Sequence, residues 1–313
     1  MVGMDLRIVF MGSPDFSLPT LTALTQMFNV VGVVTQPDRP AGRGRKIQSP
    51  PVKILAQTFG LPVLQPISLK NPEAVEQIQA LSPEVIVVAA FGQILKQNIL
   101  QMPTYGCINV HASLLPRWRG AAPVQAAVLH DEVSGVTIMK MDQGLDTGPI
   151  LSQRSTPITD EMTAGMLFDR LAQMGADLLV ETLPGYVYGE ISPRPQEEAQ
   201  ATYAPQLRKE DGKLDFNQPA AFLARQVRAY NPWPGSFADF DGAMLKIFRA
   251  HAVVHAHAIP GRHYIVDSKP AWGTQEGLLV LDEVQAAGKS RMGGDVFLHG
   301  TRDWIEEEEA KDE

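Results

Sequence analysis

The sequence predicts an α/β domain with a mostly parallel sheet, followed by a small β domain. Apolar runs such as 85–90 contain no polar residue, and they alternate with helix-like stretches over the first 110 residues. Strands that are apolar on both faces are typical of a parallel sheet covered by helices on both sides. After residue 230 the strand-like runs are short and lie between glycine and proline turns, which favours a small barrel or sandwich.

The predicted elements of the α/β part follow one another along the chain. Strands are expected at 6–11, 30–35, 62–65, 85–90 and 107–110, and helices at about 16–27, 52–59 and 72–81. The connection over 37–51 is rich in proline, glycine and basic residues, so it is predicted to be a loop. Beyond residue 130 the pattern changes to two strands, 136–141 and 150–154, and a helix over 164–183.

The β part is expected to follow a linker, in which prolines and polar residues show no periodicity. It contains a predicted helix at 219–229 and predicted strands at 244–248, 264–267 and 277–281. The last eight residues include six acids and one lysine, a composition typical of a solvated end. We therefore predict an N-terminal domain at 1–189, a linker at 190–207, a C-terminal domain at 208–305 and a disordered acidic tail at 306–313.

Composition and charge limit the class of protein. A chain of 313 residues is long enough for two domains with sizeable cores. The net charge of −8, of which −5 lies in the tail, argues against a generally basic nucleic-acid surface. No apolar run approaches the roughly 18 residues of a membrane span, and the first seven residues contain no secretory signal. We expect a cytoplasmic protein with no membrane partner.

A single cysteine, Cys107, excludes an internal disulfide framework and a cysteine-based zinc cluster. It lies inside an apolar, strand-like run, so a buried structural thiol is favoured over a nucleophile. No histidine-rich ligand spacing is visible, and we expect no metal. Nucleotide motifs also fail, because Ser13-Pro14 replaces the second glycine of a dinucleotide fingerprint. Gly42 and Gly44 are not followed by the Gly-Lys-Ser/Thr of a phosphate-binding loop.

Asn109, His111 and Asp146 are the strongest candidate catalytic residues. In a strand, side chains alternate, so Asn109 and His111 project on the same face. Asp146 lies on a glycine-flanked loop that could complete the group, although Asp142 of the same loop is an alternative carboxylate or a turn cap. An amide, an imidazole and a carboxylate supply a neutral donor, a tunable acid or base, and an orienting charge. This combination suits acyl transfer without a covalent enzyme intermediate.

Two further groups of residues indicate ligands. Segments 91–95 and 111–116 follow predicted strands, where open parallel sheets bind ligands, and a flat heteroaromatic molecule could lie between them. Basic residues crowd the 37–51 loop and flank Trp118, an interleaving that suits a single-stranded nucleic-acid end. A solvated surface loop is the alternative reading of the first cluster. The candidate phosphate-binding residues are Arg39, Arg43, Arg45, Lys46, Arg117 and Arg119.

The chain resembles the 10-formyltetrahydrofolate-dependent formyltransferases. The resemblance begins with Asn109-Val110-His111, Ser113-Leu114-Leu115-Pro116 and Asp146, which are similar to the signature of that family. Segments 36–44, 116–125 and 231–235 are similar to the members that formylate an aminoacyl-tRNA. The similarity runs from the first predicted strand to about Trp304, so it covers nearly the whole chain.

The resemblance implies a doubly wound, Rossmann-like N-terminal domain and an OB-like C-terminal β-barrel that binds tRNA. It implies transfer of the formyl group of 10-formyltetrahydrofolate to the α-amine of initiator methionyl-tRNA, with Asn109, His111 and Asp146 as the catalytic set. The Arg43 loop would reach the acceptor end of the tRNA. The folate site would be lined by Ser113, Leu114, Leu115, Pro116, Phe91, Gln93, Ile94, Leu95 and Asp142.

One feature departs from the expected pattern, and two other functions stay open. Residues 209–305 contain 11 Lys and Arg and 11 Asp and Glu, whereas the family's C-terminal domain is generally positively charged. One alternative is a formyltransferase acting on a small amine such as an amino-sugar nucleotide. The other is a non-catalytic folate- or RNA-binding module. We expect a monomer.

Overall fold

The computed structural model describes residues 4–41, 46–301 and 304. The chain forms two compact units, and the first contains residues up to 123, 133–157 and 168–204. The second unit contains 124–132, 158–167 and residues from 205 onward. Two short segments of the predicted N-terminal domain therefore group with the C-terminal part. The domain boundaries predicted from the sequence remain a proposal about independently folding parts.

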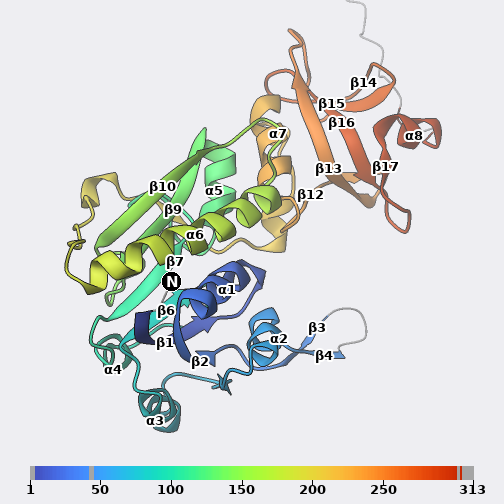
Figure 1. The fold of residues 1–313 in the computed structure, drawn as a ribbon. Coiled ribbons are helices and arrows are strands. Elements are labelled where there is room, and N and C mark those ends of the chain that lie inside the picture. The colour runs from blue at the N-terminus through green and yellow to red at the C-terminus, as the bar shows by residue number, and fades with distance from the viewer. Residues whose placement is uncertain (1–3, 42–45, 302–303, 305–313) are drawn as a thin grey trace, which may run out of the picture. The chain divides into compact units, whose positions relative to one another are not determined.

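A seven-stranded sheet forms the centre of the first unit (Figure 1). The strand order is β10-β9-β7-β6-β1-β2-β5. The pairs among the last five of these strands are parallel, whereas β9 pairs antiparallel with both β7 and β10. The predicted mostly parallel, doubly wound sheet is confirmed. Its strands are β1 (Met4–Gly12), β2 (Phe28–Val34), β5 (Val63–Leu64), β6 (Val85–Ala89), β7 (Cys107–His111), β9 (Val133–Lys140) and β10 (Ile150–Pro157).

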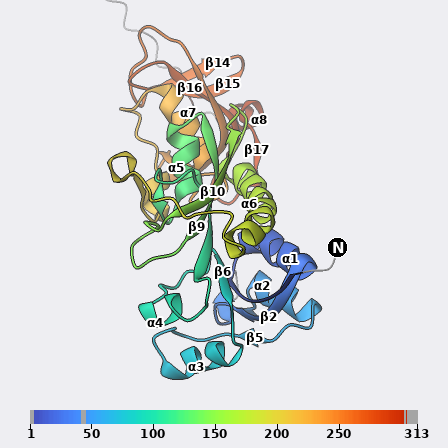
Figure 2. The same cartoon turned by 60° about the vertical axis from the view of Figure 1, so that its left-hand side comes forward.

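Helices cover both faces of this sheet (Figure 2). On one face, Ile78 of α3 (Pro72–Ala80) and Ile99 of α4 (Gln97–Leu100) join a core cluster with Cys107 of β7. On the other face, α6 (Ala164–Val187) packs so closely that a Cβ on Gly175 would meet Val110. Helices α1 (Leu18–Met27), α2 (Pro51–Thr58) and α3 each begin with a proline in their first two positions, where the missing N–H costs nothing.

The structure adds elements where the sequence predicts a loop and a linker. Part of the 37–51 connection is an antiparallel pair, β3 (Arg39–Ala41) with β4 (Lys46–Gln48). Within the predicted linker, β11 (Tyr203–Ala204) pairs in parallel with β8 (Arg119–Gly120). Both pairs are too short to give a periodic pattern, which explains why the sequence does not indicate them. The predicted tail at 306–313 lies outside the described residues.

The second unit is built on an antiparallel sheet in the order β12-β13-β16-β15-β14, with β17 paired to β16. Its core contains Leu223 of α7 (Ala220–Ala229) together with Trp272 and Trp304. The small β domain predicted for the C-terminal part is confirmed. The remaining elements are α5 (Pro123–His130), β12 (Ser236–Phe240), β13 (Ala243–Val253), β14 (His263–Val266), β15 (Lys269–Gly273), β16 (Leu278–Gln285), β17 (Met292–Gly293) and α8 (Gly294–His299).

None of the helices in the described part of the chain combines the length and the apolar character that crossing a lipid bilayer requires.

Candidate active site

The candidate site lies at the carboxyl end of β7, where the strand order places ligand sites in open α/β sheets. Cys107, Asn109 and His111 alternate along β7 onto one face, as the sequence predicts. All five residues of the strand are buried. Within the described residues, the side-chain amide of Asn109 has no hydrogen-bond partner of its own. Its donors are therefore available to a bound molecule.

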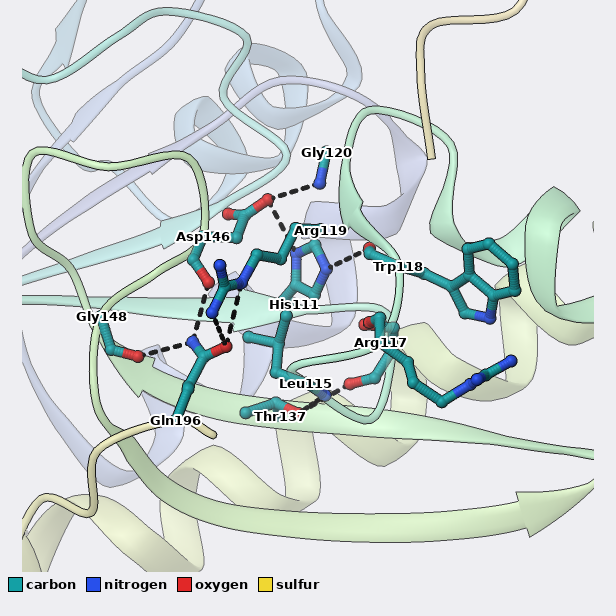
Figure 3. A network of polar contacts seen from close by, with 11 residues as sticks. His111, Leu115, Arg117, Trp118, Arg119, Gly120, Thr137, Asp146, Gly148 and Gln196 are labelled. Atoms are coloured by element: carbon teal, nitrogen blue, oxygen red, sulfur yellow. Dashed lines mark hydrogen bonds and ion pairs between the residues drawn. The ribbon is translucent and has the colours of Figure 1, made fainter. Parts of the chain in front are cut away.

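The imidazole of His111 lies between two oxygen atoms (Figure 3). Its Nε2 is 3.1 Å from the carbonyl oxygen of Trp118, and its Nδ1 is 3.7 Å from Oδ2 of Asp146. His111 is only 6% exposed, so both contacts are shielded from water. Of the two candidate carboxylates, Asp146 is the one that the structure brings to His111.

These two contacts constrain the protons on the ring. A carbonyl oxygen only accepts a hydrogen bond, so the contact with Trp118 requires a proton on Nε2. A neutral ring would then present the lone pair of Nδ1 to the carboxylate of Asp146. The geometry therefore identifies Nε2 as the ring nitrogen that donates and Nδ1 as the one that faces Asp146.

Asp146 is held by its neighbours in an unusual conformation. Its φ of +54° lies in the left-handed region, which Asp tolerates better than most residues. Oδ2 accepts a hydrogen bond of 2.9 Å from the backbone N–H of Gly120. At Gly120 the φ is +112° and a Cβ would lie 2.7 Å from the carbonyl oxygen of Ala204, so only glycine fits there. The carboxylate is thus aimed at His111 from a fixed loop.

Asp142, the alternative carboxylate, caps its own turn. Its Oδ1 accepts hydrogen bonds from Gly144 N at 2.9 Å and from Thr147 Oγ1 at 2.7 Å. This is the turn-capping role that the sequence leaves open for Asp142. The expected contact of Asp142 with folate stays a prediction.

Residues 113–116 form a rigid turn directly after β7. Thr137 Oγ1 donates to the carbonyl of Ser113 at 2.7 Å and accepts from the N–H of Leu115 at 3.0 Å. Ser113 Oγ donates to the carbonyl of Arg117 at 2.6 Å. Ser113 and Leu115 are buried, whereas Leu114 and Pro116 are partly exposed. A ligand at this turn would therefore meet Leu114 and Pro116 rather than Ser113 or Leu115.

Segment 91–95 follows β6 and divides into buried and exposed parts. Phe91 and Leu95 pack into the core beneath the sheet. The side-chain amide of Gln93 bonds the backbone of Leu69 and of Pro66 at 3.0 and 3.2 Å. Ile94 is 87% exposed, so among the predicted folate-site residues of this segment its side chain is the most accessible to a ligand.

The candidate phosphate-binding residues do not share one environment. Arg39, Lys46 and Arg117 are exposed, whereas Arg43 and Arg45 lie outside the described residues. Arg119 is 1% exposed, and its guanidinium forms two hydrogen bonds of 3.0 and 2.9 Å to the carboxylate of Glu198. Glu198 raises the pKa of Arg119, and Arg119 lowers that of Glu198. We therefore correct the expectation for Arg119, because its charge is already neutralised inside the protein.

Two residues that the sequence does not indicate also reach the site. Gln196 and Thr202 belong to the predicted linker, yet their side chains bond the loops on either side of His111. Neither residue lies in a motif or a periodic element. No local signal could have identified them, since their role depends on contacts across 50 to 84 residues of sequence.

Cys107 is the buried structural thiol that the sequence predicts. Its side chain is inaccessible, and its Sγ lies 3.6 Å from the carbonyl oxygen of Ile99. Burial raises the pKa of the Cys107 thiol to about 12. A thiol in that state is a poor nucleophile. Among the described residues, no three His, Cys, Asp or Glu side chains are grouped to hold a metal ion.

The fold and the site define a class of protein. The family model described as "Formyl transferase" matches residues 6–183, and that described as "Formyl transferase, C-terminal domain" matches residues 206–302. The two matches follow the order of the parallel and antiparallel sheets, and together they place the chain among the formyl transferases.

Relatives narrow this class to one family. A methionyl-tRNA formyltransferase of Citrifermentans bemidjiense is 48% identical over 300 residues, which is 94% of this chain and 93% of that protein. Another, from Magnetococcus marinus, is 49% identical over 297 residues, covering 94% and 95% of the two chains. The chain belongs to the methionyl-tRNA formyltransferase family.

Solved structures share the fold at much lower identity. The N-formyltransferase from Helicobacter canadensis, in complex with folinic acid and dTDP-3-aminofucose, has a TM-score of 0.65 at 17% identity. The similarity covers 90% of this chain and 100% of that one. A methionyl-tRNA formyltransferase from Clostridium thermocellum has a TM-score of 0.54 at 14% identity, covering 91% and 100% of the two chains.

Proposed function

We propose that this chain transfers the formyl group of 10-formyltetrahydrofolate to the α-amine of initiator methionyl-tRNA, for translation initiation. The observation that carries the proposal is the imidazole of His111, held between the Trp118 carbonyl and the Asp146 carboxylate at the end of β7. Identities of 46% to 49% with seven methionyl-tRNA formyltransferases support the choice of acceptor.

Asn109 and His111 are proposed to stabilise the reacting oxygen. When the amine attacks the formyl carbon, negative charge develops on the formyl oxygen. As this adduct collapses, the bond from the formyl carbon to N10 of the folate would break, N10 would take up the proton that the amine loses, and tetrahydrofolate would leave. The free amide of Asn109 and an N–H of protonated His111 would donate to the formyl oxygen. Both groups are buried, so their hydrogen bonds are little weakened by water. At 3.7 Å the contact between Nδ1 and Asp146 is an ion-pair distance and not a hydrogen bond, so an N–H on Nδ1 would donate to the formyl oxygen while the carboxylate stays beside the ring.

Asp146 is proposed to hold the imidazole charged and to take part in moving the proton that leaves the amine. A carboxylate 3.7 Å from Nδ1 stabilises positive charge on the ring. Oδ2 accepts a hydrogen bond from the N–H of Gly120, so Oδ1 would be the oxygen that takes part in moving the amine's proton. No step requires a nucleophilic side chain, which agrees with the inert state of Cys107.

The formyl donor is proposed to lie across the ends of β6 and β7. 10-Formyltetrahydrofolate supplies the formyl group, and it presents a flat ring and a polar edge to the protein. Ile94 and Leu114 offer apolar contact, while the turn at 113–116 fixes its position relative to His111. These residues are adjacent to Asn109 and His111, which fits a donor whose formyl carbon must reach them. The other predicted folate-site residues that are buried would support these contacts without touching the folate through their side chains; they are Phe91, Leu95, Ser113 and Leu115.

The tRNA acceptor is proposed to contact cations of the 37–51 connection and Arg117, which follows β7. The cations of the connection are Arg39, Arg43, Arg45 and Lys46. Arg117 lies 5.0 Å from the ring of Trp118, so a cation and an aromatic ring adjoin each other beside the site. Phosphate contact and base stacking are the two interactions by which proteins bind single-stranded ends. We further propose that the protein acts in the cytoplasm and as a monomer.

The proposal is tested by comparing acceptors. The full-length protein is supplied with 10-formyltetrahydrofolate and either charged initiator tRNA or a free amino-sugar nucleotide. We expect formyl transfer to the tRNA and little to the sugar nucleotide. Faster transfer to the sugar nucleotide would favour a small-substrate enzyme. Binding without turnover of either acceptor would favour a non-catalytic module.

The same assay tests the loop. Arg43→Ala should weaken tRNA use at physiological salt far more than folate binding, which is measured separately as the internal control. Loss of one phosphate contact should also reduce the slope of log affinity against log salt by about 0.7. Unchanged tRNA use would remove this loop from the mechanism.

A further inference from the structure

Segment 196–204 contacts both loops that flank His111. On one side Gln196 bonds the loop of Asp146 (Figure 3). On the other, Thr202 Oγ1 accepts a hydrogen bond of 2.9 Å from the N–H of Trp118. Segment 196–204 lies in the first unit together with the site, so these contacts belong to one compact body. The sequence predicts only a linker here.

Gln196 uses its whole side-chain amide in this position. Nε2 donates to the carbonyl oxygens of Asp146 and Gly148, at 2.7 Å in each case. Oε1 accepts from Nε and Nη2 of Arg119 at 3.2 and 3.0 Å. Carbonyls only accept and a guanidinium only donates, so the partners fix the orientation of the amide. Gln196 therefore ties the backbone on both sides of Thr147 to Arg119.

Gln196 bonds the backbone segment that carries the Asp146 carboxylate and sets its direction. Asp146 has a left-handed φ of +54°, which a non-glycine residue keeps only when its surroundings hold it there. The carbonyl is held by Gln196 and the carboxylate by the N–H of Gly120. Loss of the Gln196 contacts would free the loop to relax, and the 3.7 Å approach of Oδ2 to His111 would widen.

Arg119 gives Gln196 a rigid support. Its buried guanidinium bonds Glu198 twice and lies 3.4 Å from the hydroxyl of Tyr203. Two parallel bonds between a guanidinium and a carboxylate fix the geometry more strictly than one. Arg119 also belongs to β8, next to Gly120, whose N–H bonds Asp146. One short segment thus supports both the carbonyl and the carboxylate of Asp146.

The second flank of His111 is held in a similar way. Trp118 has a left-handed φ of +58°, and its carbonyl oxygen lies 3.1 Å from Nε2 of His111. Thr202 holds the backbone around it, because its carbonyl accepts from the N–H of Arg119 at 2.9 Å and its N–H donates to Pro116 at 3.2 Å. Each ring nitrogen of His111 therefore faces an oxygen whose position depends on segment 196–204.

We propose that Gln196 is a positioning residue for formyl transfer, acting through the carbonyls of Asp146 and Gly148 to keep the Asp146 carboxylate directed at His111. The inference rests on the proposed function, because it assumes that Asp146 and His111 take part in the reaction. Gln196 itself is partly buried beneath the loop and contacts no expected substrate atom.

The test compares Gln196→Ala and Gln196→Glu in the full-length protein. Glutamate keeps the acceptor for Arg119 but loses both N–H donors to the carbonyls. We expect kcat to fall about 10²-fold in both variants, as small displacements of catalytic groups commonly cause, with KM for tRNA unchanged within about 2-fold. A near-wild-type kcat for Gln196→Glu would show that Gln196 only holds Arg119, and would overturn the proposal.

Gln200→Ala is the matched control. Gln200 lies in the same segment, but it is exposed, and among the described residues its side-chain amide bonds only the side chain of Glu197, at 2.6 Å. Its loss should leave kcat and KM unchanged. An equal loss of kcat in Gln200→Ala would indicate a general effect on the segment and would overturn the specific role of Gln196.

A double-mutant cycle separates positioning from a loss of stability. Asp146→Asn keeps the shape and the left-handed tolerance of the residue but removes the charge. In that background, Gln196→Ala should lower kcat by less than about 2-fold, because there is no carboxylate left to position. Losses that multiply would overturn the proposal. If the wild-type protein does not formylate charged tRNA at all, the proposed function fails before any variant is compared.

Discussion

The first unit buries polar groups around its site, whereas the second unit buries a cluster of aromatic rings and has exposed ion pairs such as Lys213 with Asp239. Around His111, a buried guanidinium, a carboxylate and several backbone carbonyls lie within one network. In the C-terminal unit, the ring centroids of Trp272 and Trp304 lie 4.9 Å apart in the hydrophobic core. Several of its cations pair with acids, for example Lys213 with Asp239 at 2.6 Å, where both side chains are exposed.

This difference indicates where specific geometry matters. Buried polar groups are costly unless each one finds a partner, so such a network persists where it orients reacting groups. Apolar packing is less directional and mainly stabilises the fold. Surface ion pairs contribute little to stability. The pairing of these bases with acids also agrees with the overall neutrality of residues 209–305.

The largest effect is expected from the aromatic core. Trp272 is 1% exposed and packs 4.8 Å from Phe216. Trp272→Ala should destabilise the C-terminal unit by about 3–5 kcal/mol, because it removes a large buried side chain and leaves a cavity. Calorimetric unfolding of the full chain measures the shift. Trp233→Ala, in the same unit but 55% exposed, is the control and should change stability by less than about 0.5 kcal/mol. Equal losses of stability in the two variants would contradict the assignment of Trp272 to a stabilising aromatic core.

A slightly smaller effect, in the reaction rather than in folding, is expected at the site. His111→Ala should lower kcat by about 10²- to 10³-fold, since it removes a donor to the developing charge. Asp146→Ala should show a comparable loss. His251→Ala, at a histidine of the C-terminal unit that bonds Asp282 at 2.9 Å, should leave kcat unchanged. Steady-state kinetics with saturating tRNA decide the matter, and near-wild-type turnover in both site variants would refute the assignment.

The smallest effect concerns the pH dependence of stability. Burial raises the pKa of Cys107 from 9.0 to about 12 in the folded protein, whereas the unfolded thiol ionises near its ordinary value. Between these values the folded state binds one proton more, so the free energy of unfolding falls as pH rises. The slope from this group is about 1.4 kcal/mol per pH unit.

Cys107→Ala should lack that slope. Urea unfolding at pH 8, 9.5 and 10.5 compares the two proteins, and the difference between them isolates Cys107 from other titrating groups. If the free energy of unfolding changed with pH in the same way in both proteins, the thiol would not be held protonated in the folded state. The face of β7 that carries Cys107 would then be more open to water than its burial indicates.

Much of the fold could be predicted because periodic signals are local. The predicted strand at 85–90 corresponds to β6, and the predicted helix at 219–229 corresponds to α7. Several elements without a strong pattern are missing from the prediction, among them α5 and α8. The predicted ends of elements also differ from the observed ones. Strand β13 ends at Val253, five residues beyond the end of the strand predicted at 244–248. Strand ends depend on the partner strand, which the sequence does not specify.

The site was predictable in part for the same reason. Alternation along one strand placed Asn109 and His111 on a common face, and the structure confirms the unbroken strand that this requires. Spacing could not separate Asp142 from Asp146, because both lie in one loop. Its position beside Trp118 also grouped Arg119 with the candidate phosphate-binding residues, although the structure buries it against Glu198. A residue's neighbours in space decided both questions.

The sequence by itself determined the alternating strands and helices, the polar face of β7 and the family to which the chain is similar, since these depend on residues close together along the chain. Only the tertiary structure decided which carboxylate meets His111, that Arg119 is buried against Glu198, and that segment 196–204 hydrogen-bonds the loops on both sides of the imidazole. Those outcomes depend on hydrogen bonds such as Gln196 to Asp146, across 50 residues. Contacts of that kind form only when folding brings distant segments together.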